Sequence, residues 1–164
     1  MILKLSDMLR FMLYESEDKK VFIGKEIDYI NHFIDFQRLK IEGEPRISVS
    51  FEHAERQVLI EPMLLIPFIE NAFKHSKIED IRNGWVKIVL QSNNARINFK
   101  VSNSLPASVI NTDKVGGIGL ENVKKRLIYL YPKTHTLQIS QENGEFSVEL
   151  DITLRTEKKD SQKK

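Results

Sequence analysis

The apolar residues of this chain change their spacing near residue 45, and this change restricts the fold more than any other feature. Before it, isoleucines recur in steps of three, four or seven, which predicts a helix over residues 22–42 (Ile23, Ile27, Ile30, Ile34 and Ile41). After it, residues 46–51 alternate as a half-buried strand does. The chain therefore combines helices and strands within 164 residues, room for one domain and an appendage.

Helical and strand patterns alternate along the rest of the chain. Residues 3–15 are predicted to form a helix, joined to helix 22–42 in a hairpin by the polar residues 16–20. Pro62 suits the first position of a helix that ends near Ser76, whereas Pro67 either kinks that helix or marks its true start. Two strand hairpins with a helix between them complete the pattern (85–90 with 96–101, helix 119–131, and 137–140 with 146–152).

This order predicts an α+β fold, a two-layer sandwich in which helices cover a mixed or antiparallel sheet behind an N-terminal helical hairpin. Three parts are expected: the hairpin over residues 1–43, a domain over 44–154, and a disordered basic tail over 155–164. The tail carries five basic and two acidic residues, and no basic stripe with interleaved aromatic residues occurs elsewhere. Nucleic acid is therefore not expected as a partner.

Two further classes of protein are excluded by composition. The chain has no cysteine, so disulfides and thiolate metal sites are absent and a reducing cytoplasm suits it. No apolar run approaches the roughly 20 residues that cross a bilayer.

A first candidate site lies in the segment Ile69-Glu70-Asn71-Ala72-Phe73-Lys74-His75. A helix would present Asn71, Lys74 and His75 on one face, because they are three and four residues apart. An amide oxygen suits Mg²⁺, and a lysine places a point charge near a polyphosphate. The alternative is an ordinary solvated face of an amphipathic helix.

A second candidate site is the glycine-rich segment Gly116-Gly117-Ile118-Gly119, which runs directly into a helix. Its backbone N–H groups can approach phosphate oxygens, and the helix adds the positive end of its dipole. The segment lacks the Gly-Lys-Ser/Thr ending of a P-loop, and it follows a polar loop, which a dinucleotide fingerprint would not. The alternative is a flexible loop.

These two segments resemble those of a known family. The stretch Pro62-Met-Leu-Leu-Ile-Pro-Phe-Ile-Glu-Asn-Ala-Phe-Lys-His-Ser76 resembles the N box of the GHKL ATPase superfamily, in the form found in LytS-type sensor histidine kinases. Gly117-Ile-Gly-Leu-Glu-Asn-Val-Lys-Lys-Arg-Leu127 is similar to their second glycine box. The resemblance extends over almost the whole chain and implies an ATP-binding catalytic domain.

The resemblance implies a role for each candidate residue. Asn71 would ligate Mg²⁺, Lys74 and His75 would lie near the phosphates of ATP, and residues 104–116 would form the ATP lid. The backbone of Gly117, Ile118, Gly119 and Leu120 would contact the phosphates. No catalytic residue is assigned; Lys74 is the candidate that stabilises phosphate charge.

The chain departs from the family pattern at three places. Asn103 stands where relatives have an aspartate that accepts a hydrogen bond from adenine, and the glycines that follow it in relatives are absent. Pro67 stands where hydrolytic members have a glutamate, so slow hydrolysis is expected. The phosphoacceptor segment Pro-His-Phe-Leu-Phe-Asn does not occur, so we expect a fragment of a longer kinase that cannot phosphorylate itself.

The expected partners follow from the same resemblance. They are the upstream phosphoacceptor helix, a response regulator and, in the intact protein, a second copy. The fragment is expected to be the cytoplasmic portion of a kinase that upstream segments anchor in the membrane. The alternatives are a non-catalytic pseudo-kinase with a degenerate nucleotide site and, from the isoleucine stripe alone, a helical dimerisation protein.

Overall fold

The computed structural model describes residues 19–105 and 118–154, whose main sheet has five strands in the order β2-β4-β5-β7-β6. Strand β2 pairs in parallel with β4, and every other neighbouring pair is antiparallel. Both predicted hairpins are confirmed, with longer strands than expected. The bounds are Arg46–Ser50 for β2, Trp85–Asn93 for β4, Arg96–Ser104 for β5, His135–Glu142 for β6 and Glu145–Thr153 for β7.

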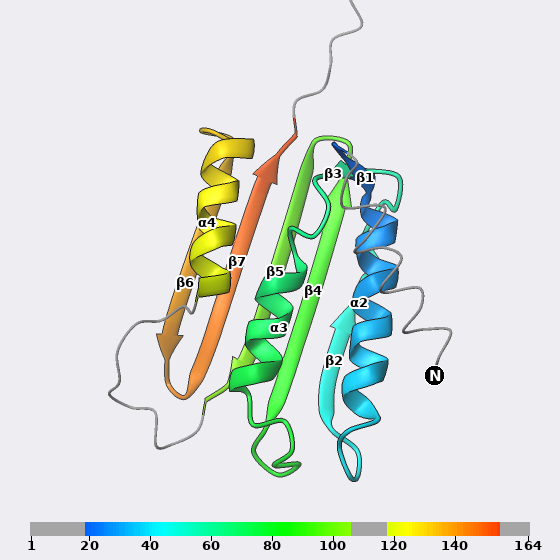
Figure 1. Ribbon diagram of the computed structural model, residues 1–164, viewed down its shortest axis with the longest axis vertical. Helices are drawn as coiled ribbons and strands as arrows, with labels where there is room; N and C mark the ends of the chain where they lie inside the picture. The colour runs from blue at the N-terminus through cyan, green and yellow to red at the C-terminus, as the bar shows by residue number, and fades with distance from the viewer. Residues whose placement is uncertain (1–18, 106–117, 155–164) are drawn as a thin grey trace, which may run out of the picture.

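Three helices lie side by side on one face of this sheet (Figure 1). They are α2 (Ile23–Arg38), α3 (Ile66–His75) and α4 (Ile118–Leu130). Alternate residues of the central strands point at them and are buried, as the period of two requires (Val86, Ile88 and Leu90 of β4; Ile97, Phe99 and Val101 of β5; Val148, Leu150 and Ile152 of β7). The predicted α+β sandwich of helices on a mixed sheet is confirmed.

Helix α2 is tied to the domain at its first turn. It follows directly on β1 (Val21–Phe22), which pairs antiparallel with β3 (Leu59–Ile60) in a second, two-stranded sheet. The amides of Ile23 and Gly24 donate to the carbonyls of Val58 and Arg56 at 2.7 and 2.9 Å. The isoleucines of its buried face then join the core that α3 and the strands share (Ile23, Ile27, Ile30 and Ile34).

Two predicted helix limits are wrong. Helix α2 ends at Arg38, not at residue 42, because the next amides turn back on Gln37 and Arg38 and Gly43 takes a left-handed φ of 98°. Helix α3 does not start at Pro62. It starts at Ile66 with Pro67 in its first turn, where a missing N–H costs nothing, so the second of the two readings of Pro67 is confirmed.

Several predictions lie outside the described residues. They concern the first helix over 3–15, residues 106–116 of the expected lid, Gly117 and the tail 155–164. The division at residue 43 stays a prediction. Within 19–105 and 118–154, no helix is both long and apolar enough to span a bilayer.

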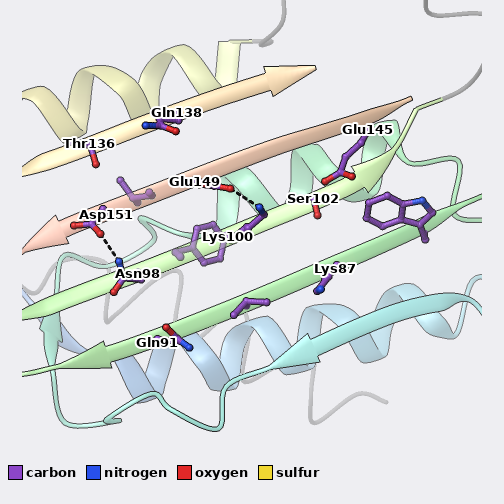
Figure 2. A pocket seen from close by; sticks show the side chains of 14 residues that line it. Lys87, Gln91, Asn98, Lys100, Ser102, Thr136, Gln138, Glu145, Glu149 and Asp151 are labelled. Carbon is purple, nitrogen blue, oxygen red and sulfur yellow. Dashed lines mark hydrogen bonds and ion pairs between the residues drawn. The ribbon is translucent and has the colours of Figure 1, made fainter. Parts of the chain in front are cut away.

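The face of the sheet opposite the helices is polar and carries a shallow hollow of about 750 Å³ (Figure 2). Several of its polar groups pair across neighbouring strands, because Lys100 pairs with Glu149 and Asn98 donates to Asp151. Arg96 also pairs with Asp151, at 2.8 Å. Cross-strand pairing of this kind is typical of a solvated sheet surface.

Candidate functional site

The polar residues of the first motif occupy one side of α3, as predicted. The opposite side of the helix faces the core (Ile66, Phe68, Ile69, Ala72 and Phe73). Asn71 is half-buried, whereas Lys74 and His75 are exposed in the last turn. Partial burial, and secondarily the neighbouring Lys74 ammonium, lower the pKa of His75. Lys74 supplies a positive charge at this end of α3 that a phosphate would neutralise.

Asn103 is the most unusual polar residue of the helix-covered face. It continues the inward-facing series Phe99 and Val101 on β5, and its side chain is fully buried. Its Nδ2 donates to the carbonyl of Ser104 at 2.8 Å, but its Oδ1 has no hydrogen-bond partner. A buried acceptor left unpaired costs about 1–3 kcal/mol, so such an atom in a folded domain points to a missing partner.

The next residue fixes Asn103 against the end of α3. The hydroxyl of Ser104 donates to the carbonyl of Ser76, the C-cap of α3, at 2.7 Å, and accepts from the amide of Trp85 at 2.9 Å. Figure 1 shows the C-terminal ends of α3 and β5 toward the lower end of the molecule, and the N-terminal end of α4 is directed toward that end. Of the candidate residues, Lys74 and His75 therefore lie in the last turn of α3, Asn103 near the end of β5, and Ile118 and Gly119 in the first turn of α4.

The first turn of α4 supplies backbone groups and little side-chain bulk. A Cβ added to the exposed Gly119 would meet nothing within 4 Å, so its backbone is open to a ligand. Leu120, by contrast, is buried in the core and holds the turn in place. The first amides of a helix have no partner within it and attract anions. Ile118 begins this turn, and Gly117 lies outside the described residues.

The donor set suits Mg²⁺ better than a transition metal. Within the described residues, no three His, Cys, Asp or Glu side chains cluster in a way that would hold a metal ion. Asn71 offers one half-buried amide oxygen. Mg²⁺ commonly takes one or two protein oxygens and completes its shell with phosphate oxygens and water, so this sparse set fits it.

Sequence analysis missed a junction at the other end of α3. Glu26, on the first turn of α2, is fully buried and accepts from the amides of Met63 at 2.6 Å and Leu65 at 3.3 Å. From α4, Arg126 donates to the carbonyls of Met63 at 3.1 Å and Pro62 at 2.9 Å. One signal was available: Glu26 lies three residues after Ile23 and four before Ile30, within the apolar stripe.

Comparisons with known proteins agree with this fold. The sequence profile of a family described as "Histidine kinase" matches residues 1–45. The "Sensor histidine kinase/phosphatase LytS" of several Staphylococcus aureus strains is 26% identical over 151 residues, with 84% of this chain covered. The chain spans about a quarter of the length of these curated relatives, as the match covers 26% of them.

Solved histidine kinase structures share the architecture. The Acinetobacter baumannii histidine kinase AdeS superposes with a TM-score of 0.58 at 15% identity, covering 94% of this chain and 77% of that one. The catalytic domain of the histidine kinase ThkA superposes with a TM-score of 0.52 at 14% identity, and the match covers 82% of this chain and 94% of that one. ThkA in complex with the response regulator protein TrrA gives 0.53 at 16%, covering 94% and 48%. The chain is thus a homologue of the LytS sensor histidine kinases, and its described residues have the fold of a histidine kinase catalytic domain.

Proposed function

We propose that this chain is the ATP-binding catalytic domain of a two-component sensor histidine kinase. It would supply the γ-phosphoryl group of Mg-ATP to a histidine that lies outside these 164 residues. The observation that carries the proposal is the buried, unpartnered Oδ1 of Asn103, whose neighbour Ser104 is hydrogen-bonded to the C-cap of α3. An adenine amino group is a donor of the kind that this acceptor lacks.

The rest of the nucleotide would extend from Asn103 along the ends of α3 and α4. Asn71 would hold the magnesium ion, with Lys74 and His75 near the phosphates. The backbone of Gly117, Ile118, Gly119 and Leu120 would donate to phosphate oxygens at the positive end of α4. Bound Mg²⁺ would neutralise phosphate charge and orient the β- and γ-phosphates.

The chemical step needs positioning and charge neutralisation, with no protein nucleophile from this domain. A nitrogen of the acceptor imidazole attacks the γ-phosphorus, the N–P bond forms, and the bond to the β-phosphate oxygen breaks so that ADP leaves. Lys74 would stabilise the negative charge that gathers on the transferred group. Pro67 occupies the first turn of α3 and cannot activate water, which favours transfer over hydrolysis.

The partners follow from this role. The acceptor helix of the same protein would deliver the histidine, and a response regulator would take the phosphoryl group on an aspartate. The complex of ThkA with a response regulator supports the second partner. The intact protein would be a homodimer that works from the cytoplasmic side of the membrane.

Calorimetric titration with ATP and ADP, with and without Mg²⁺, tests the proposal. We expect Mg²⁺-dependent binding by the wild type that Asn71→Ala abolishes, because the change removes the metal's only protein oxygen in the proposed site. Asn94→Ala, an exposed turn residue, is the matched control and should bind as the wild type does. A folded wild-type chain that binds no nucleotide at millimolar concentration would refute the proposal.

Phosphoryl transfer tests the second half of the proposal. Incubated alone with radiolabelled Mg-ATP, the chain should acquire no acid-labile, base-stable phosphohistidine. A longer chain of the same protein that includes the acceptor helix, with its own nucleotide site inactivated, should be labelled when this chain is added. Labelling of the isolated chain would show that the acceptor lies within these residues.

A further inference from the structure

The loop between β3 and α3 forms a concave backbone site around the carboxylate of Glu26. The amides of Met63 and Leu65 donate to its two oxygens, and the amide of Leu64, between them, also faces it. Met63 takes a left-handed φ of 57°, which turns successive amides to the same side. Backbone nests of this kind bind anions, and here the anion belongs to another helix of the same chain.

Arg126, on helix α4, also holds this loop. Its guanidinium donates to the carbonyls of Pro62 and Met63, the peptide units on either side of the left-handed turn. Its charge also lies close enough to lower the pKa of Glu26 in part. The amides of the loop are therefore held from α2 and its carbonyls from α4, so three elements meet through one strained turn.

This arrangement does not serve stability alone. Burial outweighs the hydrogen bonds and Arg126 and raises the pKa of Glu26 to about 7, so the ionised carboxylate costs folding free energy. A glutamine would not carry that charge, although its NH₂ group would face one of the backbone donors. What the charged pair does supply is geometry, because Glu26 holds two amides of the loop and Arg126 holds two of its carbonyls.

We propose that Glu26 and Arg126 are positioning residues that fix the start of α3, and so set where Asn71 lies relative to the first turn of α4. The inference rests on the proposed function. Helix α3 has ten residues and moves as a rigid unit, so a displacement at Ile66 also displaces Asn71, about 7.5 Å further along the helix. The loop 62–65 is held from both sides directly before α3 begins. Arg126 belongs to α4, the helix whose first turn is proposed to bind phosphate, so the contact links that turn to the start of α3.

Nucleotide affinity and stability, measured together on the full chain, test this role. Mg-ATP is titrated calorimetrically at pH 8 into the wild type, Glu26→Gln and Arg126→Lys, and each is unfolded in urea. Glu26→Gln keeps the shape but faces one backbone donor with an NH₂ group. Arg126→Lys keeps the charge but cannot bridge two carbonyls. The matched controls are Asp28→Asn on α2 and Lys125→Gln on α4, neither of which contacts the loop in the structure.

We expect Glu26→Gln and Arg126→Lys each to weaken Mg-ATP binding about tenfold or more, the usual effect of losing a group that orients a ligand-binding residue. The urea midpoint of Glu26→Gln at pH 8 should not fall. If Glu26 had a purely structural role, its replacement would lower the stability and leave the affinity of the folded chain for Mg-ATP unchanged. A lower affinity without a lower urea midpoint therefore identifies a positioning role. Arg126→Lys carries the test if Glu26→Gln does not fold.

The pH profile gives a second signature. The groups that face Glu26 are Arg126 from α4 and Tyr29 from α2, and the carboxylate of Glu70 on α3 reaches Tyr29 in turn. The ratio of wild-type to Glu26→Gln affinity cancels the titration of ATP itself. It should rise from near one at pH 6 to its full value at pH 8. Equal affinities at pH 8 would overturn the inference and leave the proposed function standing, whereas a folded wild type that binds no nucleotide would overturn both.

Discussion

Replacing Glu26 by glutamine is expected to make the protein more stable relative to the wild type as the pH rises. The carboxyl is fully buried, and burial raises its pKa from 4.5 to about 7 in the folded chain. Between these values the folded chain holds a proton that the unfolded chain has released. The wild type's free energy of unfolding therefore falls as the pH rises from 4.5 to 7 and is level above it. Glutamine does not titrate, so its free energy lacks this term.

The size of the effect follows from the shift. At about 1.4 kcal/mol per pH unit, the full difference is about 3.4 kcal/mol, of which about 2.5 kcal/mol falls between pH 5 and pH 8. Because glutamine resembles the protonated carboxyl in shape and hydrogen bonding, the two proteins should be similarly stable at pH 5. At pH 8 the variant should be the more stable by about 2–3 kcal/mol.

Urea unfolding at pH 5, 6, 7 and 8, followed by the fluorescence of Trp85, measures this difference directly. Subtracting the variant from the wild type at each pH removes the titration of every other group. Asp28→Asn is the control, because it removes a carboxylate that lies on the same helix and is more than half exposed. If the difference in the free energy of unfolding between wild type and variant does not change between pH 5 and pH 8, the pKa of Glu26 is not raised by burial, and the prediction is refuted.

Three further changes test other parts of the structure. Asn103→Leu should weaken Mg-ATP binding at least about tenfold. It removes an unpaired buried acceptor but also the Nδ2 bond to the carbonyl of Ser104, and because these two effects oppose each other, urea stability should change by less than about 1 kcal/mol. Equal binding, with Asn98→Leu as control, would contradict the adenine role. Phe68→Ala empties a fully buried site beside Phe99 and should cost about 3–5 kcal/mol, and a loss below about 1 kcal/mol would place Phe68 outside the core. Lys133→Gly, at a φ of 63°, should gain about 0.5–1 kcal/mol over both wild type and Lys133→Ala in thermal unfolding, and no gain would mean that the turn is unstrained.

Local patterns were sufficient to predict most of the fold. The hairpins β4–β5 and β6–β7 were predictable because strand alternation and turn residues such as Asn143-Gly144 are encoded within a few neighbours. The pairing of strands that lie far apart in the sequence was not predictable in this way. Strand β1 is only two residues long and exists because Leu59–Ile60 lies beside it, and the parallel partner of β2 lies across a long connection.

The candidate site was predictable to a different degree at its two ends. The face formed by Asn71, Lys74 and His75 needs only helical spacing, and α3 provides it. That Asn103 is buried with a free acceptor depends on its register in β5 and on the packing of α3 over that strand, which one segment cannot encode. Glu26 was overlooked because a glutamate on a helix is usually solvated, and its partners are backbone amides about forty residues away.

The short pairing of β1 with β3 has a mechanical consequence. The chain enters helix α2 directly from β1, and β3 leads directly into the loop that Glu26 holds. A pull along the chain ahead of Val21 would load the β1–β3 pairs and the amides of Ile23 and Gly24 together, and with them the core side chains of Val21 and Ile60. Because these hydrogen bonds share the load, they should resist a small force together. A force applied upstream of Val21 would therefore displace α2 and β3 together. The loop before α3 would move with them, because it follows β3 in the chain and is held by Glu26 of α2.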